Sequence, residues 1–338
     1  MIRIGIVGFG FMGKMHFKCY KQNNHVQIVA ICDVDKKKLK KSTNTIGNIK
    51  GSEEPLDLTG IKLYTDFKKM LDEAELDAVS ITVPTYLHCT YTLRALKSGV
   101  HVLCEKPMAL NSRDAKKMMT TAKKSGKLLQ IGHCIRFWPE YVTLKNVMDS
   151  GKYGRVLAAT FDRLSLTPTW NWDNWMLDNT RSGGAALDLH IHDADYIQYV
   201  FGMPKKIFSR GAKGPSGGLD HVVTNFMYND KIVTAEGGWI MMPKFGFEMS
   251  FRVVMEKATL LYDCNQKPTL KICPYKGKII VPRIESKDGY ALEISHFIKA
   301  VLGKAVPKIL TPKQSYDSIC LIEAAEKSVQ SGKIVVLP

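Results

Sequence analysis

A carboxylate and an imidazole lie four residues apart in the segment Gly183–Asp193, whose sequence is GGAALDLHIHD. On an α-helix, Asp188 and His192 occupy positions i and i+4 and share one face, where the carboxylate can orient the imidazole. An imidazole held in this way can take a proton from a hydroxyl group as a general base. The other interpretation of the segment is an acid near a helix N-terminus followed by a histidine of the core.

The same segment contains His190, two residues before His192, and a His-x-His pair also suits a metal ion. On a helix, however, these two side chains point about 200° apart and cannot share one ion. We therefore expect no metal ligands in this chain.

A lysine follows the expected strand 100–104, in the sequence Glu105-Lys106-Pro107. Ligands of open α/β sheets bind at the carboxyl ends of the strands, so Lys106 is placed to donate a hydrogen bond to a substrate oxygen. The alternative interpretation is a surface lysine in a turn.

Three glycines, Gly8, Gly10 and Gly13, follow the expected strand 2–7 and open an expected helix over 12–21. In this context the G-x-G-x-x-G pattern predicts a dinucleotide site. The first glycine permits the tight turn, the second lets the backbone approach a pyrophosphate, and the third lets the helix pack closely on the strand. The pyrophosphate then lies at the helix N-terminus, where N–H groups and the macrodipole favour an anion.

Asp33 lies 20 residues after Gly13, at the end of the second expected strand, 26–32. An acid at this place holds the ribose hydroxyls of a dinucleotide and repels a 2′-phosphate, which favours NAD over NADP. The lysines at 36–38 argue the other way, because they can pair with that phosphate.

The elements that must position these residues change character along the chain. Up to about residue 132, short apolar strands alternate with helical segments such as 112–125, which predicts a parallel sheet covered on both faces. A short basic helix is expected over 35–42. After residue 133, longer strands separated by turns predict a mainly antiparallel sheet with a few helices. We expect an N-terminal domain over 1–132 and a C-terminal domain over 133–338.

The composition is ordinary except for charge. The 338 residues contain 48 Lys+Arg and 32 Asp+Glu, a formal net charge of +16. The lysines are scattered and accompany no nucleic-acid-binding motif, so we expect neither a nucleic acid nor a membrane as partner. The 8 cysteines form no C-x-x-C pair and are expected to be reduced, as in a cytoplasmic protein.

With these motifs, the chain resembles the Gfo/Idh/MocA family of sugar and polyol dehydrogenases over nearly its whole length. The resemblance implies a Rossmann domain, an α/β domain whose open antiparallel sheet forms a dimer or tetramer face, and a cis bond before Pro107. It implies that Lys106, Asp188 and His192 form the catalytic group. Residues expected along the cofactor are Gly8, Phe9, Gly10, Phe11, Met12, Gly13, Asp33, Val83, Pro84, Thr85, His88, Glu105, Lys106 and Arg136.

The segment Trp170–Trp175 contains more tryptophan than the family pattern requires. Tryptophan faces suit the C–H faces of sugars, so Trp172 and Trp175 are expected to join Lys106, Asp188 and His192 in contacting substrate. The alternative is a hydrophobic anchor to the second domain or to another subunit.

The function predicted from these features is an NAD(P)-dependent oxidoreductase that transfers hydride between a secondary alcohol of a sugar, sugar derivative or cyclitol and nicotinamide. Two other functions stay open. One is an NAD-dependent, redox-assisted glycosidase or lyase, and the other is a non-catalytic regulator that binds a dinucleotide or a sugar.

Overall fold

A computed structural model describes residues 1–40, 56–304 and 309–337. The chain forms two compact units. The first contains Met1–Cys134 and Tyr290–Tyr316, and the second contains Ile135–Gly289 and Asp317–Pro338. The segment Tyr290–Tyr316, which the sequence analysis assigned to the C-terminal domain, therefore belongs with the first unit.

The first unit is built on a six-stranded sheet in the order β3-β2-β1-β4-β5-β6, in which every pair of neighbours is parallel. The order reverses between β1 and β4, and ligands of such sheets bind beyond the carboxyl ends of the strands at this reversal. This confirms the predicted Rossmann sheet. The strands are β1 (Ile2–Val7), β2 (Val26–Cys32), β3 (Lys62–Tyr64), β4 (Ala78–Ile81), β5 (His101–Glu105) and β6 (Leu129–Gly132).

Helices connect these strands, as the alternating pattern predicted. The expected helix over 112–125 has these bounds in the structure, and its first turn is capped by Asn111, whose side chain accepts a hydrogen bond from the backbone N–H of Asp114. The helices are α1 (Phe11–Lys21), α2 (Phe67–Glu73), α3 (His88–Lys97), preceded by the 3₁₀ turn η1 (Thr85–Leu87), and α4 (Ser112–Ser125).

A later helix, α8 (Gly289–Val301), completes the core of the first unit. Its residues Ile294, Phe297 and Ile298 are buried against side chains of β1 and α1, including Ile4 and Phe17. Burial of large apolar side chains of this kind contributes roughly 1.5–3 kcal/mol each.

The predicted helix over 35–42 is wrong for the residues that the structure describes. Residues 36–39 form a turn, in which the Lys38 N–H donates to the Asp35 carbonyl. The Asp35 side chain also accepts from the Lys37 N–H, a local bond that competes with helix formation. Residues 41 and 42 lie outside the described residues.

The second unit contains an eight-stranded sheet in the order β13-β12-β11-β7-β10-β9-β8-β14. Among the strands that the structure describes here, only β7 and β10 pair in parallel, so the sheet is mainly antiparallel, as predicted. The strands are β7 (Val156–Leu166), β8 (Lys206–Lys213), β9 (Leu219–Met227), β10 (Ile232–Met241), β11 (Phe247–Met255), β12 (Ala258–Asp263), β13 (Leu270–Pro274) and β14 (Val335–Val336).

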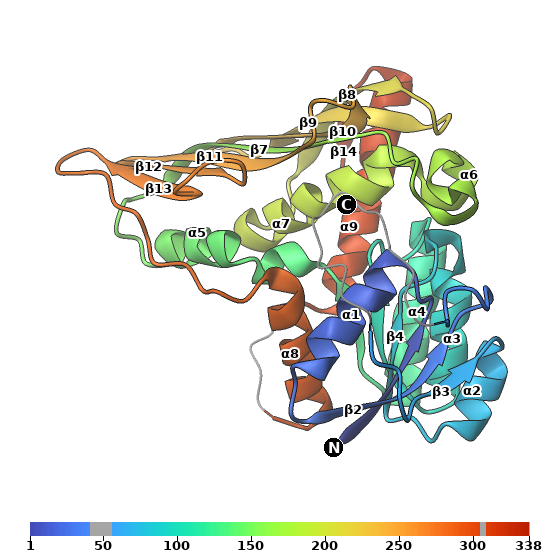
Figure 1. The fold of residues 1–338 in the computed structure, drawn as a ribbon. Helices are drawn as coiled ribbons and strands as arrows, with labels where there is room; N and C mark the ends of the chain where they lie inside the picture. Colours follow the sequence, from blue (N-terminus) through green and yellow to red (C-terminus); the bar gives the residue numbers. More distant parts are fainter. Residues whose placement is uncertain (41–55, 305–308, 338) are drawn as a thin grey trace. The chain divides into compact units, whose positions relative to one another are not determined.

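Two helices, α5 (Pro139–Asp149) and α7 (Ile191–Phe201), lie along one face of this sheet (Figure 1). Tyr141 of α5 and Tyr196 of α7 pack edge-on against Phe251 and Phe161 of the sheet, at centroid distances of 5.1 and 5.9 Å. The helix α9 (Pro312–Ser331) follows near the C-terminus. In the described part of the chain, no helix is long and apolar enough to cross a bilayer.

Candidate active site

The glycine turn between β1 and α1 has the geometry that the motif predicts. Gly8 has a φ of +88°, and a Cβ there would lie 2.6 Å from the Thr82 carbonyl oxygen. A Cβ on Gly13 would collide with the Gly8 carbonyl, so helix and strand need glycine at both places. A Cβ on Gly10, in contrast, would meet no described atom within 4 Å. Packing therefore does not explain Gly10, whereas room for a ligand's pyrophosphate does.

The N-terminus of α1 lacks a competing acid. Its N-cap residue is Gly10, no side chain caps the helix, and its first turn contains no Asp or Glu. The backbone N–H groups of this turn and the helix dipole therefore favour an anionic group there.

Asp33 connects the end of β2 to the glycine turn. Its Oδ2 accepts a hydrogen bond of 2.7 Å from the Phe9 N–H, and its Oδ1 accepts one of 2.9 Å from the Asp35 N–H. Lys38 Nζ lies 3.6 Å from Oδ2. Each carboxylate oxygen has a second lone pair, so Asp33 can accept bonds from ribose hydroxyls while the turn keeps its shape.

The segment Val83–His88 follows β4 at the same edge of the sheet. The buried ring of His88 lies between two backbone carbonyls, with Nδ1 2.7 Å from the Pro107 oxygen and Nε2 2.9 Å from the Val83 oxygen. Burial lowers the pKa of His88, whereas the two carbonyl acceptors oppose this shift. The side chain links the 83–84 turn to the segment that contains Lys106.

Lys106 follows β5, and its peptide bond to Pro107 is cis, as the resemblance implies. The preceding residue, Glu105, is buried, and its carboxylate lies 2.9 Å from Nε2 of His16 on α1. His16 was not predicted, because its partner is 89 positions away and no local pattern joins the two.

In the second unit, Asp188 and His192 are both buried near the start of α7. The α-helix expected around Asp188 and His192 begins instead as a π-helical turn, Ala186–His190, followed by α7. A π turn contains more residues than an α turn, so the i and i+4 argument for a shared face does not apply unchanged. Single π turns are frequent at functional sites.

Two buried ion pairs hold α7 just after His192, at Asp193 and Asp195. Asp193 accepts hydrogen bonds of 2.7 and 3.0 Å from Arg163 of β7. Asp195 accepts two of 2.8 Å each from Arg136, which lies in the 3₁₀ turn η2 (Cys134–Phe137). Bidentate pairs of this kind fix direction as well as distance. The backbone that carries His192 is therefore held firmly.

His190 is a core residue of the second unit. Its Nε2 lies 2.9 Å from Thr224 Oγ1, which in turn lies 3.0 Å from Ser209 Oγ. Burial lowers the pKa of His190 to about 4, so the ring is neutral at pH 7.

The tryptophan segment forms a short 3₁₀ element, η3 (Trp172–Leu177), just before α6 (Asn179–Ser182). Two of its residues, Asp173 and Asn174, have φ values of 53° and 46°, which Asp and Asn tolerate better than other side chains. Arg181 donates to the Asp173 carbonyl and pairs with its carboxylate, at 3.2 and 3.0 Å. The loop is thus held in one shape while 41% of Trp172 is exposed.

The predicted site residues belong to two sets. The first unit brings together the glycine turn, Asp33, the 83–88 segment, Glu105 and Lys106. The second unit contains Arg136, Trp172, Trp175, Asp188 and His192.

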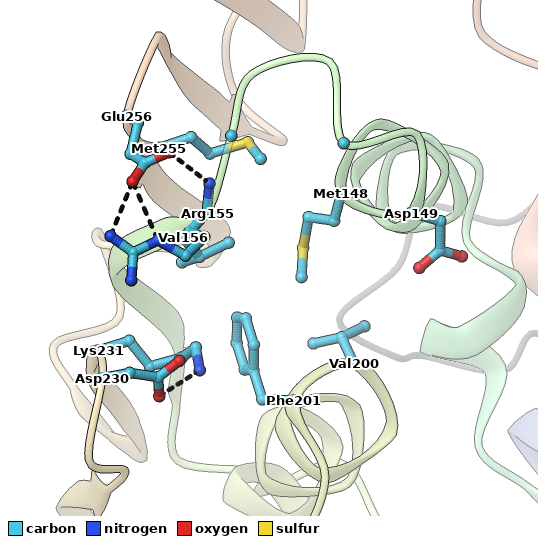
Figure 2. Close-up of a pocket in the computed structure, with 12 residues that line it drawn as sticks. Met148, Asp149, Arg155, Val156, Val200, Phe201, Asp230, Lys231, Met255 and Glu256 are labelled. Carbon is cyan, nitrogen blue, oxygen red and sulfur yellow. Dashed lines mark hydrogen bonds and ion pairs between the residues drawn. The ribbon is translucent and has the colours of Figure 1, made fainter.

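The second unit also contains a cavity of about 540 Å³ that sequence analysis did not predict. Figure 2 shows apolar side chains of Met148, Val200 and Phe201 facing it. Four of the lining charges are paired with each other, Arg155 with Glu256 and Lys231 with Asp230, and Asp149 pairs with Lys145. None of the predicted site residues lines this cavity.

Comparison with known proteins relates both units to one family. Residues 2–133 match the Gfo/Idh/MocA oxidoreductase family, described as an NAD-binding Rossmann fold, and residues 141–261 match the Gfo/Idh/MocA C-terminal domain. D-glucoside 3-dehydrogenase of Escherichia coli (strain K12) is 29% identical, over 99% of this chain and 97% of that protein. Myo-inositol 2-dehydrogenase of Thermotoga maritima is 25% identical, over 99% and 98%.

A similar fold is found among solved structures. The WlbA dehydrogenase from Bordetella pertussis, in complex with NADH and UDP-GlcNAcA, has a TM-score of 0.81 at 20% identity. The match covers 100% of this chain and 99% of that chain. At this identity the likeness shows that the fold is shared.

Proposed function

We propose that this chain, which belongs to the Gfo/Idh/MocA family of oxidoreductases, is an NAD-dependent dehydrogenase of sugars, sugar derivatives or cyclitols. The observation that carries the proposal is the glycine turn at the reversal of the sheet. There, Gly10 faces open space at an uncapped helix N-terminus, and Asp33 lies at the end of the next strand. Full-length relatives with dehydrogenase names support the substrate class.

The residues of the first unit fit NAD. The Gly8–Gly13 turn, including Phe9, Phe11 and Met12, would hold the pyrophosphate and its surroundings. Asp33 would accept hydrogen bonds from ribose hydroxyls. The segment Val83–His88, with Pro84 and Thr85, would lie along the cofactor. When bound, NAD supplies the nicotinamide ring that accepts hydride. On this proposal, the cofactor contacts lie within residues 1–132, and the substrate contacts other than Lys106 lie within 133–338.

Three residues would act on the substrate. His192 would remove the proton from a secondary hydroxyl group as general base, at the carbon that is oxidised. Lys106 donates a hydrogen bond to the substrate oxygen and stabilises its developing negative charge. Asp188 orients His192 or a neighbouring hydroxyl. In the reverse direction, the same groups would return a proton to the oxygen of a keto-sugar.

Two further residues have narrower roles in this proposal. Trp172 would offer an apolar face to the C–H groups of a sugar, since its indole is partly exposed on a well-held loop. Trp175 would belong to the same lid. Arg136 would act indirectly, because its guanidinium is bound to Asp195 on α7. We therefore assign Arg136 to the support of His192.

We further propose that the chain forms a homo-oligomer through one face of the C-terminal sheet. The strand register places Val223, Glu236, Asp162 and Ser250 in one row across four strands, and all four side chains are at least partly exposed. Burial and the neighbouring Glu236 and Glu248 raise the pKa of Asp162 to about 6. Val223, which is 41% exposed, is the apolar group that a second copy of the sheet would cover.

The oligomer proposal is tested by Val223→Glu in analytical ultracentrifugation. The expected result is a smaller species than the wild-type protein, with an unchanged circular dichroism spectrum. Met242→Glu, an equally apolar but loop-borne exposed residue, is the matched control and should not change the mass. Equal masses for all three proteins would contradict the proposed interface.

The enzymatic proposal is tested with a panel of inositols, aldoses, sugar phosphates and glycosides, each with NAD⁺ and NADP⁺, followed at the nicotinamide absorbance. Net NADH formation with a sugar or cyclitol is the expected result. Product formation without net NADH, with cofactor that copurifies, would instead indicate the redox-assisted glycosidase or lyase. Dinucleotide binding without turnover of any compound would indicate the regulator.

A further inference from the structure

We infer that His16 is a positioning residue for Lys106, and that it acts through the buried carboxylate of Glu105. The inference rests on the proposed function, in which Lys106 contacts the substrate. His16 itself lies on α1 and is fully buried.

The contacts form one continuous chain of buried polar groups. The Tyr20 hydroxyl lies 2.7 Å from Ser80 Oγ, and Ser80 Oγ lies 3.1 Å from His16 Nδ1. His16 Nε2 lies 2.9 Å from Glu105 Oε1. The other carboxylate oxygen, Oε2, accepts a 3.1 Å hydrogen bond from the backbone N–H of Lys106. This chain of hydrogen bonds therefore ends on Lys106, the residue that the mechanism requires to be placed accurately.

The proton positions in this chain follow from the chemistry of its ends. An ionised carboxylate can only accept, so His16 Nε2 carries the hydrogen that it donates to Glu105. In the neutral ring, Nδ1 then accepts from the Ser80 hydroxyl, and Ser80 accepts from Tyr20. Every member has a partner with the correct polarity. Fully satisfied networks of this kind rigidify the groups that they connect.

The charge on Glu105 depends on His16. Burial by itself would raise the Glu105 pKa, but the hydrogen bond from His16, aided by the charge of Lys106, lowers it. A buried carboxylate without its donor would have to take up a proton or move. Loss of the His16 donor would therefore change both the charge and the position of the group that holds the Lys106 backbone.

Steric packing leaves the carboxylate little freedom. A Cβ on Gly132 of β6 would lie only 3.1 Å from Glu105 Oε1, so the carboxylate sits directly against the neighbouring strand. On the far side of Lys106, the Pro107 carbonyl lies 2.7 Å from His88 Nδ1. Lys106 is thus flanked by two residues, each of which is held by a buried histidine.

Two substitutions of His16 test this inference. In His16→Gln the side-chain amide reaches the place of Nε2 and can donate to Glu105, whereas in His16→Asn it reaches only the place of Nδ1, toward Ser80. We expect kcat to fall by less than about tenfold in His16→Gln and by about 100-fold in His16→Asn, the order of loss typical of a misplacement near 1 Å. The dissociation constant for NAD should stay within about threefold in both.

His101→Asn is the matched control, since His101 lies at the amino end of β5, the strand that ends at Glu105. It should leave kcat unchanged. Glu105→Gln, which keeps the shape of Glu105 and removes its charge, should reproduce the kcat loss of His16→Asn. A purely structural role for His16 would lower the melting temperature of the Gln and Asn variants without separating their kcat values.

Lys106→Ala, measured in parallel, distinguishes this inference from the proposed function. If Lys106→Ala keeps wild-type turnover, Lys106 is not catalytic, and the role proposed for it is wrong. If Lys106→Ala is inactive while folded His16→Gln and His16→Asn have equal kcat values, only the positioning role of His16 is overturned. Should His16→Asn not fold, an unchanged kcat in Glu105→Gln would overturn it as well.

Discussion

The ion pair between Arg136 and Asp195 yields a quantitative prediction for Arg136→Met. Neither side chain has any exposed surface, and two hydrogen bonds of 2.8 Å join them. Removal of one partner from a buried pair costs about 3–5 kcal/mol, because the other charge stays buried without compensation. Ser318 still donates a 2.7 Å bond to Asp195, so we expect about 3 kcal/mol, the lower end of this range.

The loss should depend on pH in a defined direction. Without Arg136, burial raises the pKa of Asp195 in the folded protein above its unfolded value, so protonation removes the uncompensated charge. The deficit of the variant should therefore be largest near pH 8 and shrink as the pH falls toward 4. Urea unfolding followed by circular dichroism at both pH values measures it.

A second substitution separates the broken charge pair from lost packing. Replacement of both partners of a buried pair by neutral groups of similar volume is often close to neutral. Arg136→Met combined with Asp195→Asn should therefore recover most of the stability, to within about 1 kcal/mol of the wild-type protein. A loss below 1 kcal/mol in Arg136→Met, or a double variant less stable than the single one, would refute the reasoning.

Four further predictions concern single residues. The folded-state pKa of His190 is about 4, below its ordinary value of 6.5. The neutral ring therefore contributes roughly 3 kcal/mol to the free energy of unfolding above pH 6.5, and this contribution is lost as the pH falls to 4. The free energy of unfolding of His190→Gln should lack this part of the pH dependence. Burial raises the pKa of Glu326 from 4.5 to about 7, so the folded protein loses stability as the pH rises from 4.5 to 7. Glu326→Gln should therefore be about 2 kcal/mol more stable than the wild-type protein at pH 8, a value reduced for the partial exposure of the side chain. An unchanged melting temperature at pH 8 would contradict this. Asp33→Ser should weaken the preference for NAD over NADP, and identical ratios of kcat/KM for the two cofactors would argue against a ribose contact. Lys106→Ala and His192→Ala should each lower kcat by at least about 100-fold with little change in NAD affinity, and near wild-type turnover in both would exclude the catalytic assignment.

The fold class followed from local patterns, and the structure explains why they were sufficient. The bounds predicted for β1, β2 and α4 agree with the structure because apolar runs, a capping Asn111 and the stop at Gly126 act within a few residues. Where the local patterns conflicted, prediction failed. At residues 36–39 the lysine-rich pattern suggested a helix, but the Asp35 side chain bonds the nearby backbone and a turn forms.

The amino-acid sequence alone therefore determined the two sheet types, the dinucleotide turn and the chemical identity of the candidate catalytic residues. Each of these is encoded by residue types at short spacing. Only the tertiary structure decided how those residues are held. Glu105 meets His16 across 89 positions, Asp195 meets Arg136 across 59, and Asp193 meets Arg163 across 30. No sequence period links such partners. They pair because each buried charge needs a hydrogen-bonding partner, and folding decides which ones come within reach.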